Sequence, residues 1–214
     1  MTESLNICSW NLTGTGGAGG LVLQSVLSEK EIDVACFQEA PKPPNMLIVL
    51  NEQFNLFYSE IIYESGFSIH LCTAVRKNLN FEITQINDSP SGTLMIVLGR
   101  GNKRIVIANI YYAINEGANS ERNQNTFANE IMKKVKKHGK IRIIAGDLNS
   151  VENNGKDAAT RRSPRQQILI NALTETYIDT HRYDNPAKTK ELWTFKLQGM
   201  PNSRIDYILI NHKH

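Results

Sequence analysis

Side chains that carry carboxylate, amide or phenol groups follow directly after several apolar segments of this sequence. Asn11 follows LNICSW, Glu39 follows VACFQ, and Tyr111 follows IVIANI. Asp147 and Asn149 come just after the run IRIIAG. Ligands of α/β sheets bind beyond the carboxyl ends of the strands, so five such residues predict one functional site. Any one of them alone is also explained by a turn, because Asp and Asn are common turn residues.

Hydrophobic patterning predicts the elements that position these residues. Apolar stripes at helical spacing predict a helix over 21–30 and another over 120–138, which ends at Gly139, while Ser163-Pro164 opens a third helix. The glycine-rich segment 13–20 is predicted to be a loop. Because strands outnumber helices, we expect two packed sheets with helices outside them. The predicted strands span residues 5–9, 32–37, 54–59, 68–75, 93–98, 104–112, 141–145 and 205–210.

Length and composition fit one compact domain over residues 1–214, with 41% apolar and 21% charged residues. The longest apolar runs are too short to span a bilayer, and the first residues do not form a secretory signal. Cys8, Cys36 and Cys72 lie in apolar segments and are predicted to be buried free thiols, with no zinc spacing. We therefore expect an intracellular protein without a membrane partner, nuclear if its source is eukaryotic.

Positive charge is concentrated in two clusters, although the net charge is only +3. The sequences KKVKKHGK (133–140) and TRRSPR (160–165) suit contact with a nucleic-acid phosphate backbone. A solvated helix end and an exposed loop explain the same clusters, since basic residues also stabilise the last turn of a helix. Both interpretations stay open at this point.

Five motifs carry a resemblance to a known family. ICSWN (7–11), FQE (37–39), NIY (109–111), GDLNS (146–150) and SRIDYIL (203–209) occur in the order found in the endonuclease/exonuclease/phosphatase family. The chain looks most similar to the endonuclease domains of LINE-type retrotransposons and to apurinic endonucleases. The resemblance implies a four-layer α/β sandwich, in which two packed mixed β-sheets are flanked by helices.

The resemblance also implies a metal and a substrate. Glu39 matches the main ligand of Mg²⁺, with Mn²⁺ as a substitute, and Asn11 lies beside it at the metal and the substrate. A hard cation held by few protein groups keeps positions for water and a substrate phosphate. Thr194, in LWTF, matches a polar position near the substrate in the retrotransposon-type members. The implied partner is the phosphate backbone of DNA, bound by a monomer.

Four further residues match catalytic positions of the family. Tyr111 matches the hydroxyl that holds the scissile phosphate, and Asn149 matches a donor to the phosphoryl oxygens. Asp147 matches the residue that orients the attacking water or assists the leaving oxygen. Asp206 matches the carboxylate that orients a catalytic histidine. Arg204 is expected to form a structural ion pair.

The sequence departs from the family at two places. Thr13 stands where apurinic endonucleases carry an aspartate, which favours the retrotransposon-type members. The Ser-Asp-His tripeptide that supplies the histidine is absent after SRIDYIL. His212 cannot replace it on an extended strand, since six residues at about 3.3 Å each place it roughly 20 Å from Asp206. We therefore expect a truncated domain that lacks its last strand.

These features predict a Mg²⁺-dependent endonuclease that nicks DNA by phosphodiester hydrolysis and is impaired in this form by the absent histidine. A phosphatase or phospholipase on the same fold is one alternative. An inactive relative that binds nucleic acid is another. The segment TGTGGAGG (13–20) lacks the GK[ST] ending of a nucleotide-binding loop and is expected to lie on the surface.

Overall fold

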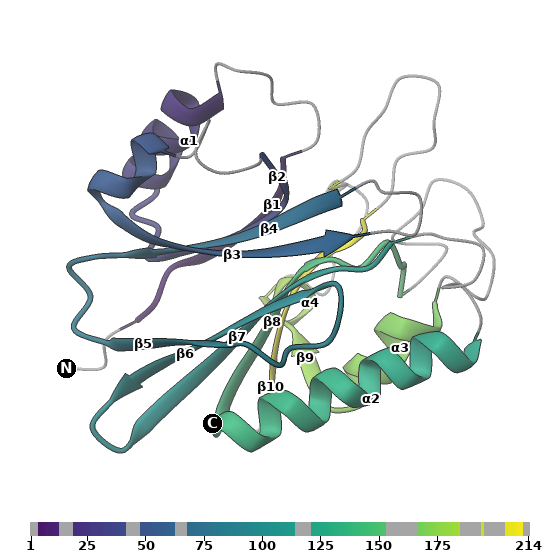
Figure 1. Ribbon diagram of the computed structural model, residues 1–214. Helices are drawn as coiled ribbons and strands as arrows, with labels where there is room; N and C mark the ends of the chain where they lie inside the picture. Colours follow the sequence, from purple (N-terminus) through teal and green to yellow (C-terminus); the bar gives the residue numbers. More distant parts are fainter. Residues whose placement is uncertain are drawn as a thin grey trace, which may run out of the picture.

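A computed structural model describes residues 4–12, 19–41, 48–62, 68–113, 121–152, 167–184, 194 and 204–211. Two β-sheets are stacked face to face, with helices on the outer face of each (Figure 1). Helix α1 (Gly19–Glu29) covers the first sheet, and α2 (Glu121–His138) and α3 (Ile168–Thr174) cover the second. This arrangement confirms the predicted four-layer α/β sandwich.

The first sheet has four strands in the order β1-β2-β4-β3. β1 (Ile7–Asn11) pairs in parallel with β2 (Val34–Ala40), and α1 forms the crossover between them. β4 (Ser68–Arg76) pairs antiparallel with both β2 and β3 (Phe54–Ile62). A short 3-10 helix, η1 (Ile48–Glu52), precedes β3.

The second sheet has six strands in the order β5-β6-β7-β8-β10-β9. Its only parallel pair within the described ranges is β7–β8, which α2 connects. A short helix, α4 (Thr180–Asp184), follows β9. The strands are β5 (Glu82–Ile86), β6 (Thr93–Arg100), β7 (Lys103–Tyr111), β8 (Ile141–Asp147), β9 (Tyr177–Asp179) and β10 (Asp206–Asn211).

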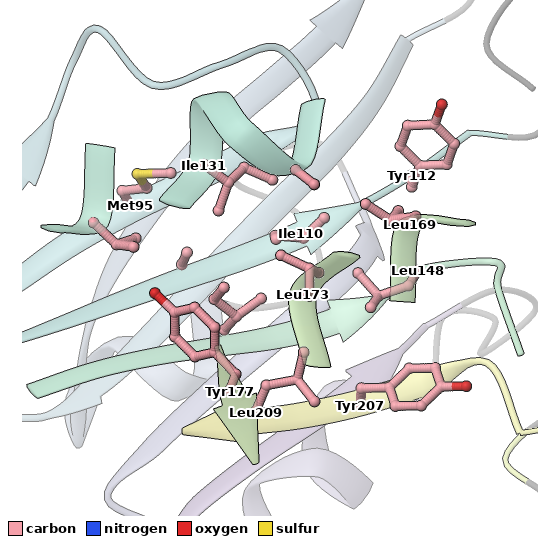
Figure 2. Packing of buried hydrophobic residues seen from close by; sticks show 14 of the residues in the cluster. Met95, Ile110, Tyr112, Ile131, Leu148, Leu169, Leu173, Tyr177, Tyr207 and Leu209 are labelled. Carbon is pink, nitrogen blue, oxygen red and sulfur yellow. The ribbon is translucent and has the colours of Figure 1, made fainter. Parts of the chain in front are cut away.

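Three apolar interfaces hold the layers together. Leu23 and Leu27 of α1 pack on Phe37 of the first sheet, and Val34 packs between the sheets with Ile107. Figure 2 shows the third interface, where Ile131 of α2 and Leu173 of α3 meet Ile110 of β7. Because the inner faces of both sheets are mostly apolar, the sheets can bury their flat sides against each other.

Several expectations need correction. Gly19 and Gly20 belong to α1 rather than to a loop, because the helix gains its stability from Leu23 and Leu27 on the sheet and tolerates two glycines at its start. Strands β5 and β9 were not predicted, since each is a short edge strand with little apolar periodicity. The described part of α3 begins at Ile168, while Ser163-Pro164 and residues 13–18 lie outside the described residues.

The cysteines are free thiols, as expected. Cys36 and Cys72 are buried, whereas Cys8 is only half-buried because β1 lies at the edge of its sheet. No helix in the described part of the chain is both long and apolar enough to cross a membrane.

Gly146 controls the approach of β8 to β7 just before Asp147. Its φ is +146°, and a Cβ atom there would lie 2.0 Å from the carbonyl oxygen of Ile110. We predict that Gly146→Ala lowers the free energy of unfolding by more than about 3 kcal/mol, measured by urea denaturation. Gly99→Ala is the matched control in the same sheet, since its Cβ would meet its nearest atom at 3.7 Å. Equal losses for the two variants would contradict this account.

Candidate active site

The side-chain amide of Asn11 joins the two sheets at the carboxyl ends of β1, β2 and β8. Its Nδ2 donates to Glu39 Oε1 at 3.0 Å and to Asp147 Oδ2 at 3.0 Å. Asn11 and Glu39 belong to the first sheet and Asp147 to the second. The structure therefore brings together three residues that lie far apart in the sequence, as the positions of the motifs predict.

Sheet register places Tyr111 and Asp206 on either side of Asp147. Tyr111 is the parallel partner of Asp147 on β7, and Asp206 is its antiparallel partner on β10. Cross-strand partners have Cβ atoms about 5 Å apart, so their side chains can act on one ligand. Tyr111 and Asp206 are both partly exposed, whereas Asp147 is buried.

Asn149 is held in a tight turn directly after β8. Its backbone N–H donates to Asp147 Oδ1 at 2.8 Å, and its side-chain Nδ2 donates to the carbonyl of Tyr112 at 2.9 Å. Its φ of +46° is a left-handed conformation that asparagine adopts more readily than most residues. An amide nitrogen carries two hydrogens, so the bond to Tyr112 orients the side chain without using both.

Thr194 lies beside Asp206 and supports its backbone. The exposed Thr194 side chain accepts hydrogen bonds at Oγ1 from the N–H groups of Ile205, at 3.0 Å, and Asp206, at 3.2 Å. The structure thus places all seven predicted residues at one end of the sandwich. Thr194 is connected to this group by the hydrogen bond that it accepts from the backbone N–H of Asp206.

Burial and like charge dominate the electrostatics of the site. Burial, followed by the negative charge of Asp206, raises the pKa of Asp147 to about 7, although hydrogen bonds from Asn11 and Asn149 oppose the shift. Burial also raises the pKa of Asp206, against a hydrogen bond from Thr194. Asp206 Oδ1 is buried and has no hydrogen-bond partner among the described residues. The site therefore concentrates negative charge that attracts a cation or a proton.

The donor set suits a cation that the protein holds with few ligands. Within the described ranges, no group of three His, Cys, Asp or Glu side chains is arranged to hold a metal ion by itself. Glu39 and Asp147 instead supply two carboxylates around one amide, and Asp206 supplies a buried oxygen without a described partner. Magnesium is commonly bound by one or two carboxylates together with waters and phosphates, so the residues fit it.

Arg204 forms the ion pair that the sequence predicts. It is buried, with its guanidinium 2.5 Å from Asp179 Oδ2 and 4.4 Å above the centre of the Tyr207 ring. The Tyr207 hydroxyl donates to the carbonyl of Ser150 at 2.9 Å. These contacts fix the start of β10 against the segment after β8, and so fix Asp206 opposite Asp147.

None of the described histidines bonds to Asp206 Oδ1. His70 of β4 pairs with Glu60 at 3.5 Å, and His138 ends α2. His181 belongs to the short helix α4 rather than to a loop, because the Asp179 side chain accepts a hydrogen bond from its backbone N–H. The terminal histidines, His212 and His214, and also Thr13, lie outside the described residues.

The basic cluster 133–140 lies at the wrong end of the sheet to line this site. It ends where β8 begins, and Asp147 is the last residue of that strand, roughly 20 Å away. Lys134 of the cluster pairs with Asp88. The helix-end interpretation therefore accounts for this cluster, and the cluster 160–165 lies outside the described residues.

Comparison with known proteins gives no match by sequence but clear matches by structure. Neither family models nor curated proteins give a match. Solved structures do match. The endonuclease domain of TRAS1, a telomere-specific non-LTR retrotransposon, superposes with a TM-score of 0.68 at 14% identity, covering 98% of this chain and 86% of its own.

Two further structures agree. The 3′ phosphatase NExo from Neisseria, bound to a product DNA hairpin, gives a TM-score of 0.69 at 15% identity, with 98% and 87% coverage. The Xenopus laevis APE2 catalytic domain gives 0.68 at 19% identity, with 96% and 82% coverage. The chain has the endonuclease/exonuclease/phosphatase fold. At these identities the likeness establishes the fold, and the chemistry of the site has to be argued from its residues.

In this endonuclease/exonuclease/phosphatase fold, sequence patterns missed two buried polar residues next to the site. Gln38 precedes Glu39, and Asn109 lies two residues before Tyr111. Both are completely buried between the sheets. The signal that could have found them is a polar residue inside an otherwise apolar strand beside a predicted site residue.

The raised pKa of Asp147 predicts how stability depends on pH. An unfolded aspartate titrates at about 3.9, so the native state binds this proton more tightly. The resulting stabilisation is fully present below about pH 4 and is lost as the pH rises through about 7. In metal-free protein, we predict that Asp206→Asn flattens this loss, because it removes the charge that raises the pKa of Asp147 after burial.

Urea denaturation at several pH values from 5 to 8 measures this effect. Asp88→Asn is the control, since Asp88 is exposed and Lys134 holds the pKa of its carboxyl below the ordinary value. The contribution of Asp88 is lost only as the pH falls toward its lowered pKa, below the measured range. A pH slope in Asp206→Asn equal to that of the wild type would show that the two carboxylates do not interact.

Proposed function

We propose that this chain is a Mg²⁺-dependent phosphodiesterase that nicks DNA, with Mn²⁺ as a substitute metal. The observation that carries the proposal is the Asn11 amide, which donates to one carboxylate from each sheet beside a third carboxylate, Asp206. Such a collection of buried and partly buried carboxylates is costly unless a cation or protons compensate for its negative charge. The likeness to nucleases of the same fold supports a phosphodiester substrate.

Glu39 and Asn11 would hold the metal, which supplies positive charge for the phosphoryl oxygens when it is bound. Tyr111 is the cross-strand partner of Asp147, and its hydroxyl would hold the scissile phosphate. Asn149 directs its amide to the same edge and would donate to the phosphoryl oxygens as negative charge develops on them. From its exposed position next to Asp206, Thr194 would contact the DNA beside the scissile phosphate.

Asp147 and Asp206 would act on the attacking water. Asp147 is fixed at both oxygens by Asn11 and Asn149, so it can accept a proton or a hydrogen bond from the water in a defined direction. Asp206 keeps a buried oxygen that has no described partner, which suits a carboxylate that orients a histidine. Because no described histidine bonds to that oxygen, we propose that the chain cuts DNA slowly.

Removal of a 3′ phosphate is the second candidate, because the similar Neisseria protein is a 3′ phosphatase bound to a product DNA hairpin. A supercoiled plasmid and a 3′-phosphorylated DNA hairpin distinguish the two activities. Nicking of the plasmid supports the endonuclease, whereas release of phosphate from the hairpin without nicking supports the phosphatase. Neither activity, with retained DNA binding, would support an inactive relative.

We predict that Glu39→Gln lowers the rate of Mg²⁺-dependent plasmid nicking by about 100-fold or more, because the cation loses its main charged ligand. Glu82→Gln is the matched control, since Glu82 is an exposed carboxylate of β5. The proposal fails if Glu39→Gln nicks as fast as the wild type, or if nicking continues after removal of divalent cations with EDTA.

DNA binding is predicted to depend on residues 160–165 rather than on the end of α2. Replacing Arg161 and Arg162 together by Ala should weaken binding and reduce the slope of log K against log salt by about 2, through fewer released counterions. Replacing Lys136 and Lys137 by Ala should leave the slope nearly unchanged, since they lie beyond the far end of β8. Fluorescence anisotropy at several salt concentrations measures both slopes, and a reversed order would refute the assignment.

A further inference from the structure

Strand β2 contains a bulge at the position of Glu39. Its register with β4 runs through Phe37 opposite Cys72 and then jumps to Ala40 opposite His70. Three steps on β2 thus match two steps on β4, so one extra residue is inserted. Glu39 lies inside this bulge with a φ of +49°, a conformation that an L-residue adopts only at an energetic cost.

The bulge determines which way Glu39 points. Phe37 packs on the helix α1 side of the sheet, and Gln38 faces the other sheet, where it meets Asn109. Strict alternation would return Glu39 to the α1 side. Its Oε1 instead meets Asn11, whose amide also reaches Asp147 of the second sheet. The extra residue therefore directs a proposed metal ligand toward the seam between the sheets.

Asn109 satisfies the backbone next to the bulge from the opposite sheet. Its Nδ2 donates to the carbonyl oxygens of Phe37 and Cys72, both at 3.0 Å. These two residues form the last regular pair before the register changes. Asn109 belongs to β7, so one side chain of the second sheet fixes the two strands of the first sheet at the point where their ladder is interrupted.

Gln38 connects Asn109 of the second sheet to β1 of the first sheet. Its Nε2 donates to Asn109 Oδ1 at 2.7 Å and lies 3.2 Å from Ser9 Oγ of β1. Gln38 and Asn109 each have 0% of their surface exposed. They lie within an interface that is otherwise lined by apolar residues such as Cys36 and Ile107. Buried amides are costly in such a place unless they are fully hydrogen-bonded, and here they form a continuous polar chain across three strands.

We infer that Asn109 and Gln38 are positioning residues for the metal site: they hold the β2 bulge from the opposite sheet and thereby direct Glu39 toward Asn11. Asn109 also lies two residues before Tyr111 on β7, so the strand that holds the bulge also carries the residue proposed to hold the phosphate. This inference rests on the proposed function, because it assigns the bulge a purpose in metal binding.

Asn211, a buried amide at the opposite end of the second sheet, provides a control for Asn109. Asn211 of β10 is 5% exposed, accepts the N–H of Arg142 at 2.7 Å and donates to the carbonyl of Lys140 at 3.2 Å. Asn211 hydrogen-bonds backbone groups as Asn109 does. It lies beside the start of β8, however, whereas the proposed site lies at the end of β8. Its loss reports on stability without touching the bulge.

The test compares Mn²⁺ binding to the full chain, measured by water-proton relaxation without DNA, in Asn109→Leu, Gln38→Met and Asn211→Leu. We expect the first two variants to lose about tenfold or more in Mn²⁺ affinity, as is typical when groups that orient a ligand are removed. Asn211→Leu should stay within about twofold of the wild type although its Tm also falls. Gln38→Met leaves the Asn109 hydrogen bonds to Phe37 and Cys72 in place, and it decides the matter if Asn109→Leu does not fold.

Two negative results have different meanings. If the wild type does not bind Mn²⁺, the proposed function fails and the positioning role fails with it. If the wild type binds Mn²⁺ and Gln38→Met and Asn109→Leu bind it equally well, the proposed function stands and the positioning role is refuted. An equal loss in all three variants would also refute it, because general destabilisation would then explain the effect.

Discussion

The repulsion between three closely placed carboxylates at one end of the sandwich is the constraint on which the rest of the site depends. Asp147 and Asp206 are cross-strand partners, and Glu39 approaches them from the other sheet. One amide, that of Asn11, donates to two of the three groups. The negative charges of Asp206 and Glu39 add to burial in raising the pKa of Asp147, so the arrangement persists only because the surrounding strands fix it. A site of this kind is prepared for a positive charge.

The architecture explains how this repulsion is contained. The parallel pairs β1–β2 and β7–β8 end at the same edge of the sandwich, which is why Asn11, Glu39 and Asp147 can meet. The ion pair between Arg204 and Asp179 then fixes β10, and with it Asp206. Burial of apolar side chains in the three interfaces stabilises the fold and offsets the cost of placing the carboxylates together. The residues that stabilise the fold thus lie between the layers, whereas the residues of the proposed site lie at one end of the sheets.

Local patterns predict most of the strands and the residues that follow them, because strand identity and strand ends depend on nearby sequence. Asp147 after IRIIAG is an example. Long-range relations could not be predicted in the same way. Nothing near Asn109 indicates that it hydrogen-bonds Gln38, 71 residues away, or that Arg204 selects Asp179. The helical state of Gly19 is also a tertiary effect, since the packing of Leu23 and Leu27 outweighs a poor local propensity.

A crystal of the chain grown or soaked with Mn²⁺ tests the central claim most directly, since the anomalous signal locates the ion independently of activity. We predict one strong peak within about 2.2 Å of a Glu39 carboxylate oxygen, next to Asn11, in the range expected for a six-coordinate divalent ion. A peak elsewhere, with Glu39 still hydrogen-bonded to Asn11 and no density between the carboxylates, would contradict the account. The buried negative charge would then have to be balanced by protons alone.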